Sequence, residues 1–343
     1  MTAATPPALP PQLRYVEDSM PGFARRLSRG KFVYIDLAGK PIRDELEIQR
    51  INKLAIPPAY QEVWICADPQ GHIQATARDA RRRKQYRYHP LWIEIRDAAK
   101  YERLLRFGQA LPALRRRIDL HLDEPGLGRD KVMAAVVALL DRTLIRIGNS
   151  RYARDNKSFG LTTLRTRHVD VKGSSIRFEF KGKSGVEHSV KLSNPRLARI
   201  LRRCLELPGQ HLFQYLDDGA ERRTVSSHDI NDYLRGHAGE DFTAKDYRTW
   251  AGSALALEHL RKHRWQNEAS ARKHLVEVIR QVSRELGNTP AVCRKCYVHP
   301  AIIDAFLAGE LQGLKKARKR KGLSAEEASL MNFLQALHAD PEG

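Results

Sequence analysis

The chain has 343 residues, of which 42% are hydrophobic; this is enough for two globular domains and excludes a chain that is disordered throughout. Sixty Lys and Arg residues against forty Asp and Glu residues leave a formal net charge of +20. Such an excess attracts polyanions and favours nucleic acid as the partner. No apolar run approaches the roughly 20 residues of a membrane-spanning helix, so we expect no membrane association.

The N-terminal stretch "MTAATPPALPPQLRY" is rich in proline and lacks the basic and apolar segments of a secretory signal. The chain has four cysteines, too few and too scattered for a disulfide framework: Cys66, Cys204, Cys293 and Cys296. Both features favour a cytoplasmic location.

Residues 1–97 are predicted to form a small, β-rich domain. "KFVYIDLAGKPI" and "EVWICADPQGHIQATARD" place β-branched and aromatic residues on both sides of turn signals at residues 38–41 and 68–71. "RRRKQYRYHPLW" has Tyr86 and Tyr88 in alternation, on one face of a third strand segment. A short helix is expected over "RDELEIQRINKL".

Residues 98–343 are predicted to form a larger, mainly helical domain. "DKVMAAVVALLDRTLIRIG" has apolar residues at helical spacing and a suitable terminating residue, Gly148. Further helices are expected over "NPRLARILRRCLEL", "SSHDINDYLRGHAG", "SALALEHLRKHRW" and "EASARKHLVEVIRQVSRELGN". The basic run "LKKARKRKG", from about residue 313, favours a solvated, disordered tail because blocks of like charge repel.

One β-hairpin interrupts this helical region, in "SSIRFEFKGKSGVEHSVKL". Apolar and polar residues alternate on both sides of a turn at residues 182–185. Lys183 is therefore expected at the tip of the hairpin. Taken together, the patterns predict an α+β protein.

The segment "VCRKCYVHP" contains a C-x-x-C pair, Cys293 and Cys296, directly before Tyr297. A structural zinc site needs four ligands and usually a second such pair, and a thioredoxin-type motif follows a strand; neither condition is met. We therefore favour the tyrosine over the thiols. A phenol is a poor nucleophile at neutral pH, so attack on a phosphodiester would need fixed cations around it.

Four segments resemble, in the same order, the catalytic segments of type IB DNA topoisomerases, in particular the compact poxvirus-like branch found in bacteria. They are "LIRIGNSRY" with Arg146, "FEFKGKSG" with Lys183, "TAKDYRTWAGS" with Arg248, and "LGNTPAVCRKCYVHP" with Asn288 and Tyr297. "RRKQYRY" is similar to a segment of the family's N-terminal clamp domain. Two positions depart from the pattern: Tyr247 stands where phenylalanine is expected, and Asn288 where histidine is more common.

The resemblance implies a mechanism. Tyr297 attacks a phosphodiester and becomes a 3′-phosphotyrosyl, while Arg146 and Arg248 hold the non-bridging oxygens with help from Asn288. Lys183 donates a proton to the departing 5′-oxygen. The broken strand rotates and is resealed, with no requirement for ATP, metal or another cofactor. The resemblance also implies a C-shaped clamp around duplex DNA, monomeric action, and a nucleoid-associated location in the cytoplasm.

Basic residues interleaved with aromatic ones predict DNA contacts at two places. The candidates are Arg81, Arg82, Arg83, Lys84, Gln85, Tyr86, Arg87 and Tyr88, together with Arg151, Tyr152 and Lys157 close to Arg146 in the sequence. The alternative for the first group is an exposed edge strand whose cations deter aggregation.

Two other functions remain open from the sequence. A tyrosine recombinase would use the same chemistry, but usually has an H-x-x-R box where this chain has Lys245 before Arg248. A non-catalytic architectural DNA-binding protein would explain the charge alone. Singly, each candidate residue also has a structural explanation, such as an arginine at a helix end. Their joint occurrence in family order favours the topoisomerase.

Overall fold

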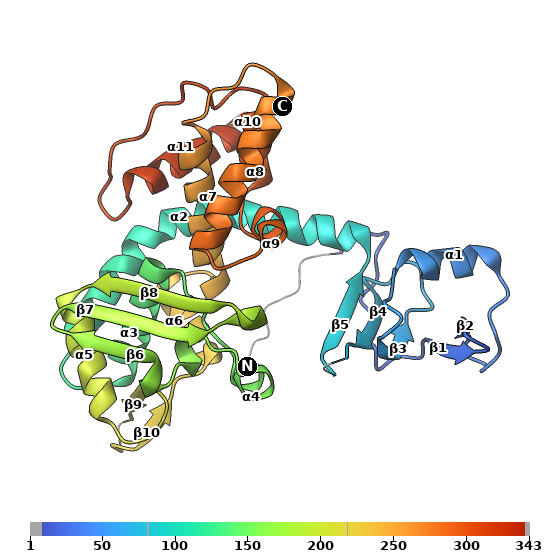
Figure 1. Cartoon of the computed structure of the whole chain (residues 1–343), viewed down its shortest axis with the longest axis horizontal. Coiled ribbons are helices and arrows are strands. Elements are labelled where there is room, and N and C mark those ends of the chain that lie inside the picture. The colour runs from blue at the N-terminus through green and yellow to red at the C-terminus, as the bar shows by residue number, and fades with distance from the viewer. Residues whose placement is uncertain (1–8, 81, 218, 340–343) are drawn as a thin grey trace. The chain divides into compact units, whose positions relative to one another are not determined.

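The computed structural model describes residues 9–80, 82–217 and 219–339, apart from the side chains of residues 97, 98 and 184 (Figure 1). The chain divides into two compact units, Met1–Glu102 and Arg103–Gly343. The expected boundary at residue 97 falls inside helix α2 (Pro90–Asp123), which begins earlier than the sequence pattern suggested and contributes residues to both units.

The first unit is built around an antiparallel five-stranded sheet of order β2-β1-β3-β4-β5. Its strands are β1 (Phe23–Ser28), β2 (Lys31–Ile35), β3 (Gln61–Ile65), β4 (Ile73–Arg78) and β5 (Lys84–Tyr88). One short helix, α1 (Glu45–Lys53), lies between β2 and β3 in the chain. The expectation of a small β-rich N-terminal region with a short helix is confirmed.

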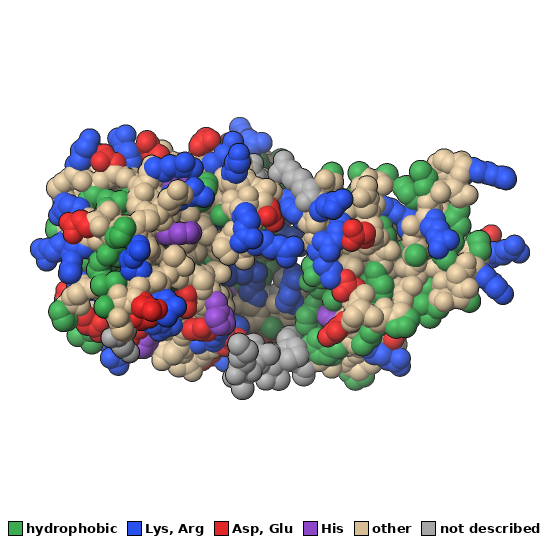
Figure 2. Space-filling model, turned by 90° about the horizontal axis from the view of Figure 1, so that it is seen from below, with side chains coloured by type: hydrophobic (Ala, Val, Ile, Leu, Met, Phe, Trp, Pro, Cys, Tyr) green, Lys and Arg blue, Asp and Glu red, His purple; other side chains and the backbone are tan. Residues whose placement is uncertain are grey.

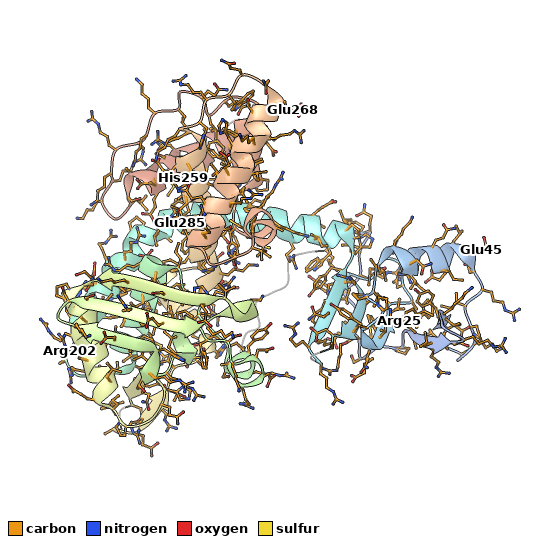
Figure 3. All side chains as sticks on the ribbon, in the orientation of Figure 1. Arg25, Glu45, Arg202, His259, Glu268 and Glu285 are labelled. Atoms are coloured by element: carbon orange, nitrogen blue, oxygen red, sulfur yellow. The ribbon has the colours of Figure 1, made fainter. Side chains whose placement is uncertain are left out.

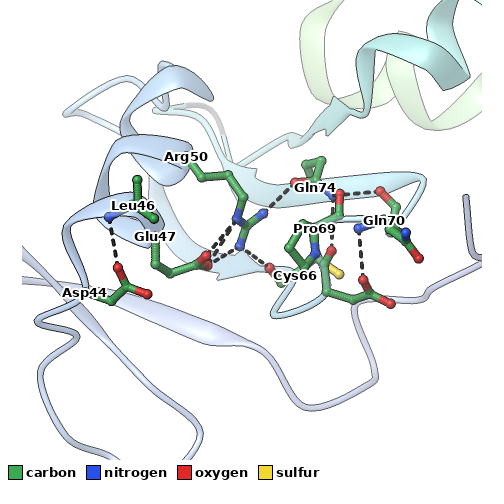
Figure 4. Close-up of polar contacts among 10 residues, drawn as sticks. Asp44, Leu46, Glu47, Arg50, Cys66, Pro69, Gln70 and Gln74 are labelled. Carbon is green, nitrogen blue, oxygen red and sulfur yellow. Dashed lines mark hydrogen bonds and ion pairs between the residues drawn. The ribbon is translucent and has the colours of Figure 1, made fainter. Parts of the chain in front are cut away.

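Arg50 joins α1 to the sheet (Figure 4). Its guanidinium donates to Gln74 Oε1 at 2.5 Å and to the backbone oxygen of Cys66 at 2.7 Å, while Glu47, one turn earlier, accepts from Arg50 Nε at 3.1 Å. The partly buried guanidinium of Arg50 therefore has hydrogen-bond partners on both the helix and the sheet, which fixes the helix on the sheet.

The second unit is mainly helical. Its central helix is α3 (Arg129–Thr143), whose residues 132–140 are all buried. Its other helices are α4 (Ser150–Asn156), α5 (Pro195–Glu206), α6 (Ser227–Ala238), α7 (Ala244–Leu260), α8 (Glu268–Glu285), α9 (Pro290–Cys296), α10 (Pro300–Leu307) and α11 (Ala325–Ala339). α7 packs against α8, where His259 Nε2 lies 3.6 Å from Glu285 Oε1 (Figure 3). Among the described helices, none is both long and apolar enough to span a bilayer.

The predicted hairpin is present as β7 (Ser175–Lys181) and β8 (Glu187–Ser193), paired from Ser175–Ser193 to Lys181–Glu187. Ile176, Phe178 and Phe180 are buried on one face, as their alternation predicts. A third strand, β6 (Val169–Lys172), pairs with β7 and was not predicted. A small separate sheet of β9 (Gln214–Leu216) and β10 (Arg222–Thr224) was not predicted either.

α3 ends at Thr143, not at Gly148 as expected. Leu144 takes a left-handed conformation (φ 55°) and its N–H donates to Leu140 O at 2.9 Å, which closes the helix early. Arg146 therefore lies in a connector outside the helix. The backbone oxygen of Arg146 accepts from Leu161 N at 2.9 Å, so the connector is held by hydrogen bonds of its own.

The basic run near residue 313 differs from the disordered tail that the sequence suggested. α11 follows it and buries Leu330, Met331 and Leu334, packing against α7. The run itself bonds to α11, since Arg320 Nη2 donates to Asn332 Oδ1 at 2.7 Å. Like-charge repulsion is offset here by polar partners on a helix further along the chain.

Candidate functional site

A cavity of about 280 Å³ in the second unit brings four segments of the chain together. It is lined by Arg146 from the connector after α3, Lys183 from the hairpin tip, Arg248 from α7, and Tyr297 at the end of α9. Their sequence separations exceed 30 residues, so only the tertiary fold can account for the convergence. Four of the five predicted catalytic residues thus line one cavity, and the fifth, Asn288, bonds directly to one of them.

Arg248 lines this cavity and is only 3% exposed. Its Nη2 donates to the backbone oxygen of Leu286 at 2.7 Å, its Nη1 donates to that of Leu144, and its Nε has no hydrogen-bond partner among the described residues. The guanidinium carbon lies 5.0 Å from the centre of the Tyr297 ring. Burial lowers the pKa of Arg248, and the Tyr297 hydroxyl opposes that effect. A buried cation with one unused donor is suited to an anionic ligand.

α7 begins at a capping box that positions Arg248. The backbone N–H and hydroxyl of Thr243 both donate to Asp246 Oδ2, at 2.8 and 2.9 Å. Arg248 then lies one turn into the helix, on the face that is buried. Lys245 lines the cavity from the same helix, three residues before Arg248.

Arg146 is anchored to the turn between α8 and α9. Its Nη1 donates to the backbone oxygen of Gly287 at 2.9 Å, and its Nη2 donates to Asn288 Oδ1. Burial lowers the pKa of Arg146, while the Tyr297 hydroxyl raises it. With its oxygen on Arg146, the Asn288 amide keeps its nitrogen as a donor, and this buried Nδ2 has no partner within the described part of the chain.

Gly287 makes this turn possible. It has φ of +59°, and a Cβ at this position would lie 2.4 Å from Cε1 of His188 on β8. His188 also approaches Gly182 at the start of the hairpin turn, where a Cβ would lie 2.5 Å from its ring, and it stacks on Phe180 with ring centres 5.0 Å apart. Burial, with Arg146 and Arg248, lowers the pKa of His188. One neutral ring therefore packs between the lysine hairpin and the Asn288 turn.

Tyr297 follows the last residue of α9 and is half-buried. Its backbone N–H donates to Cys293 O at 2.9 Å, and its backbone oxygen accepts from Ser253 Oγ at 3.3 Å. α7 approaches this point closely at Gly252, where a Cβ would lie 2.6 Å from that oxygen. The nucleophile candidate is thus held through its backbone, which leaves its side chain toward the cavity.

Lys183 is exposed at the tip, and the residues that the structure describes offer it no hydrogen bond or ion pair. Its backbone is held by the turn, in which Gly182 N donates to Val186 O at 2.7 Å. A charged amine at the mouth of the cavity can reach a ligand and release a proton to it.

The C-x-x-C thiols are not part of the cavity lining. Cys293 is fully buried in the core of the second unit, and burial raises the pKa of its thiol to about 11, so it is protonated at neutral pH. Among the described residues, neither Cys293 nor Cys296 belongs to a group of three potential metal ligands.

The predicted DNA-contact residues near α4 are placed next to the site. Tyr152 lines the cavity, whereas Arg151 and Lys157 are exposed beside it in α4 and its cap, with Arg151 Nε 3.8 Å from Asp155 Oδ2. Asn149, Ser158 and Phe159 also line the cavity and were missed. The sequence feature that could have identified these three residues is their closeness to Arg146 along the chain.

Most of the basic residues before and within β5 form ion pairs or hydrogen bonds within the first unit. Arg81 lies outside the described residues, and Arg82 is exposed with φ of +55°. The others have these partners: Arg83 and Gln85 contact Asp79 at 2.6 and 3.0 Å, Lys84 contacts Asp18 at 2.5 Å, and Arg87 donates to Ala55 O at 3.0 Å. Tyr86 is 42% exposed and stacks on Tyr88 with ring centres 5.8 Å apart. The exposed edge of β5 thus combines an aromatic face with cations whose charge is partly balanced.

Comparison with known proteins shows the family of this chain. Residues 88–322 match the family model of the eukaryotic DNA topoisomerase I catalytic core, and residues 31–79 match that of the bacterial DNA topoisomerase IB N-terminal domain. The chain is 33% identical over 287 residues to DNA topoisomerase 1B of Acanthamoeba polyphaga mimivirus, covering 81% of this chain and 85% of that protein. It is 20% identical over 256 residues to DNA topoisomerase 1B of vaccinia virus (strain Copenhagen), covering 71% and 75%. The chain belongs to the type IB DNA topoisomerase family, whose members are isomerases.

Proposed function

We propose that this protein relaxes supercoiled duplex DNA by transient cleavage of one strand, with Tyr297 as the nucleophile. The observation that carries the proposal is the cavity in which Tyr297, Arg146, Arg248 and Lys183 meet. A phosphodiester that entered it would meet a phenol and three cations contributed by separate segments.

In the proposed reaction, the Tyr297 oxygen attacks phosphorus and the bond to the 5′-oxygen breaks. The product is a 3′-phosphotyrosyl bond and a free 5′-hydroxyl, and reversal reseals the strand. Since one phosphate ester replaces another, no external energy source such as ATP is needed. The DNA end that is not bound rotates between the two steps.

Arg248 and Arg146 are proposed to stabilise the charge that develops on the non-bridging oxygens. Their backbone anchors orient both guanidinium groups before DNA binds, so little reorganisation is needed in the transition state. The unused donors, Arg248 Nε and Asn288 Nδ2, offer two further hydrogen bonds. Asn288 can donate as a histidine would, but it adds no positive charge.

Lys183 is proposed as the general acid that protonates the departing 5′-oxygen. It is exposed, lines the cavity, and lies on a turn that projects from two paired strands. Lys245, on the same helix as Arg248, also lines the cavity. The phenol of Tyr297 loses its proton to water as the new ester forms, and Lys183 regains from water the proton that it gives to the 5′-oxygen, so protons are conserved.

We further propose that duplex DNA is held between the two units as in a C-shaped clamp, by a single copy of the chain. The support is that β5 of the first unit presents stacked tyrosines and cations, that the second unit holds the whole reaction cavity, and that one chain supplies every cavity residue. Arg82, Arg83, Lys84 and Arg87 are the proposed phosphate contacts of β5 and the turn before it.

The test is to incubate the protein with supercoiled plasmid in excess EDTA without ATP and to stop the reaction with SDS. Relaxed topoisomers and protein attached to a 3′ end are expected. Tyr297→Phe should bind DNA with unchanged affinity and form no adduct, because it lacks the oxygen. A covalent adduct in Tyr297→Phe, or strand exchange between two duplexes without relaxation, would contradict the proposal.

A further inference from the structure

A second cluster of chemically competent side chains lies outside the cavity, where three helices meet. His121 is in the last turn of α2, Asp130 in the first turn of α3, and His237 in the last turn of α6. One possible ligand atom from each lies within 4.8 Å of the other two. All three residues belong to the second unit, so the cluster does not depend on the placement of the first.

The His121 ring is held in a fixed orientation. It is 7% exposed, and its Nδ1 lies 2.7 Å from the hydroxyl of Tyr233 on α6. When Nδ1 carries the proton and donates to that oxygen, Nε2 has a free lone pair. An outer hydrogen bond of this kind commonly accompanies a histidine that binds a metal ion.

One carboxylate approaches the free nitrogen, and a second lies close to the ring. His121 Nε2 lies 4.0 Å from Glu124 Oε1, in the residue that follows the end of α2 by one position. Asp130 supplies a second carboxylate from α3. Glu124 is close to half exposed and can move toward an ion, so it can complete a set of two imidazoles and two carboxylates.

The rings of the cluster lie close together. The ring centres of His121 and His237 are 4.9 Å apart, and those of Tyr233 and His237 are 4.5 Å apart, each pair in an edge-to-face arrangement. Short inward shifts of the side chains would bring the ligand atoms to the distance of about 2.0–2.2 Å from a common ion that zinc requires.

The donor set also defines the class of ion. Two imidazole nitrogens favour divalent transition metals such as Zn²⁺, Co²⁺, Ni²⁺ or Cu²⁺ over Mg²⁺ and Ca²⁺, which prefer oxygen ligands. Arg129 Nη1 lies 3.5 Å from Asp130 Oδ1 and offsets part of the negative charge of that carboxylate. Because the charge of Asp130 is partly offset, the ion is held mainly by its bonds to the two imidazole nitrogens.

We propose that His121, Asp130 and His237 bind a divalent transition-metal ion, with Glu124 or water as the fourth ligand. The ion joins the ends of α2, α3 and α6. α3 leads into the connector with Arg146, and α6 precedes α7 with Arg248. The ion therefore stabilises the helices that precede the two arginines in the chain, without taking part in the strand-cleavage reaction.

The experiment uses the full-length protein after treatment with a chelator and its removal, titrated with Co²⁺. Binding should produce visible absorption bands in the range typical of four- or five-coordinate cobalt, and Zn²⁺ should displace it. Zn²⁺ should also raise the melting temperature. Tyr233→Phe should weaken Co²⁺ binding about 10- to 100-fold, because it removes the outer hydrogen bond.

His237→Ala and the near-isosteric Asp130→Asn should abolish the bands, with circular dichroism confirming that each variant is folded. The matched control is His263→Ala, which removes a histidine from a ring pair with His274 elsewhere in the same unit and should leave the titration unchanged. The absence of bands in the unaltered protein, or equal binding by Asp130→Asn, would overturn the proposal.

Discussion

Arg248 is oriented by the protein and not by its substrate. Two of its nitrogens are occupied by backbone oxygens, and the third, Nε, is buried without a partner among the described residues. The geometry depends on a planar group with several donors at fixed angles, which a lysine cannot reproduce.

We therefore expect Arg248→Lys to lower the rate of covalent adduct formation by roughly 10²- to 10³-fold, the effect usually seen when a fixed oxyanion donor is removed. The rate is measured in a single turnover on a short duplex, and DNA affinity is measured separately. Arg284→Lys, at an exposed position in the last turn of α8, serves as the control and should keep the parent rate. An unaltered rate in Arg248→Lys would exclude the proposed role of its guanidinium.

Tyr247 illustrates a residue that differs from the family pattern. It is 1% exposed, its ring packs edge-on against Phe107 at 5.1 Å, and its hydroxyl has no hydrogen-bond partner in the described part of the chain. A buried, unpaired hydroxyl costs about 1–3 kcal/mol relative to an apolar group of the same shape.

Tyr247→Phe should therefore raise the free energy of unfolding by about 1 kcal/mol, because the ring contacts remain and the unpaired oxygen is removed. Chemical denaturation measures the change, and plasmid relaxation should stay at the parent level. A less stable variant would show that the hydroxyl has a partner in solution.

At the residue scale, the sequence singled out side chains that the structure brings together at one cavity. Arg146, Lys183, Arg248, Asn288 and Tyr297 were recognisable because each lies in a motif that resembles the family's. His188 and Gly252 were not, since their importance comes from packing: one ring fills the space between two glycines, and one missing Cβ allows two helices to approach. Contacts of this kind depend on the fold and leave no local sequence signal.

At the element scale, the position of Tyr297 depends on the close approach of α7 to the end of α9. Gly252 lies where these segments meet, and a Cβ there would be 2.6 Å from the Tyr297 backbone oxygen and 3.0 Å from its Cβ. A backbone atom cannot rotate away, so a larger residue must displace the segment that carries the tyrosine.

Gly252→Ala should thus reduce cleavage strongly while DNA binding is retained, because a shift of about 1 Å in a reacting group can cost around 10²-fold in rate. The matched control is Gly236→Ala in α6, where a Cβ would meet open space. It should keep full activity and gain roughly 0.5–1 kcal/mol of stability from the alanine. Equal activities of the two variants would contradict the packing argument.

Two segments of the second unit differ from what their sequence patterns predict. The apolar period of α3 continues past Thr143, but Leu144 adopts a left-handed conformation and frees Arg146 from the helix. The charge of the run near residue 313 favoured disorder, although α11 beyond it provides both a buried face and polar partners. In both cases tertiary contacts outweigh the local pattern. The hairpin, whose alternation is strict, was predicted correctly.

At the scale of the whole molecule, the positive charge is spread over both units, interspersed with Asp and Glu side chains on the face drawn in Figure 2. Several cations near β5 already pair with carboxylates, so DNA would compete with these partners. Binding of this kind weakens as salt concentration rises, because the release of condensed counterions into a more concentrated solution gains less free energy.

Histidines that are buried or partly buried make the stability of both units depend on pH in the same direction. Burial is the main cause that lowers the pKa of His72 in the first unit, and of His168, His188 and His263 in the second. In addition, Nδ1 of His72 accepts from Val16 N and Nδ1 of His168 accepts from Arg165 N, both at 3.1 Å. Protonation of that nitrogen would break the hydrogen bond.

Because these pKa values are lower in the folded chain than in the unfolded chain, the unfolded chain binds more protons as the pH falls through about 6.5. Stability should be fully present above that pH and decrease below it. The melting temperature is measured between pH 7.5 and 5.5, at constant salt. His168→Gln should flatten the decrease, because it removes one of the histidines with a lowered pKa. A melting temperature that is constant or rises toward pH 5.5 would show that these histidines accept protons in the folded protein without cost.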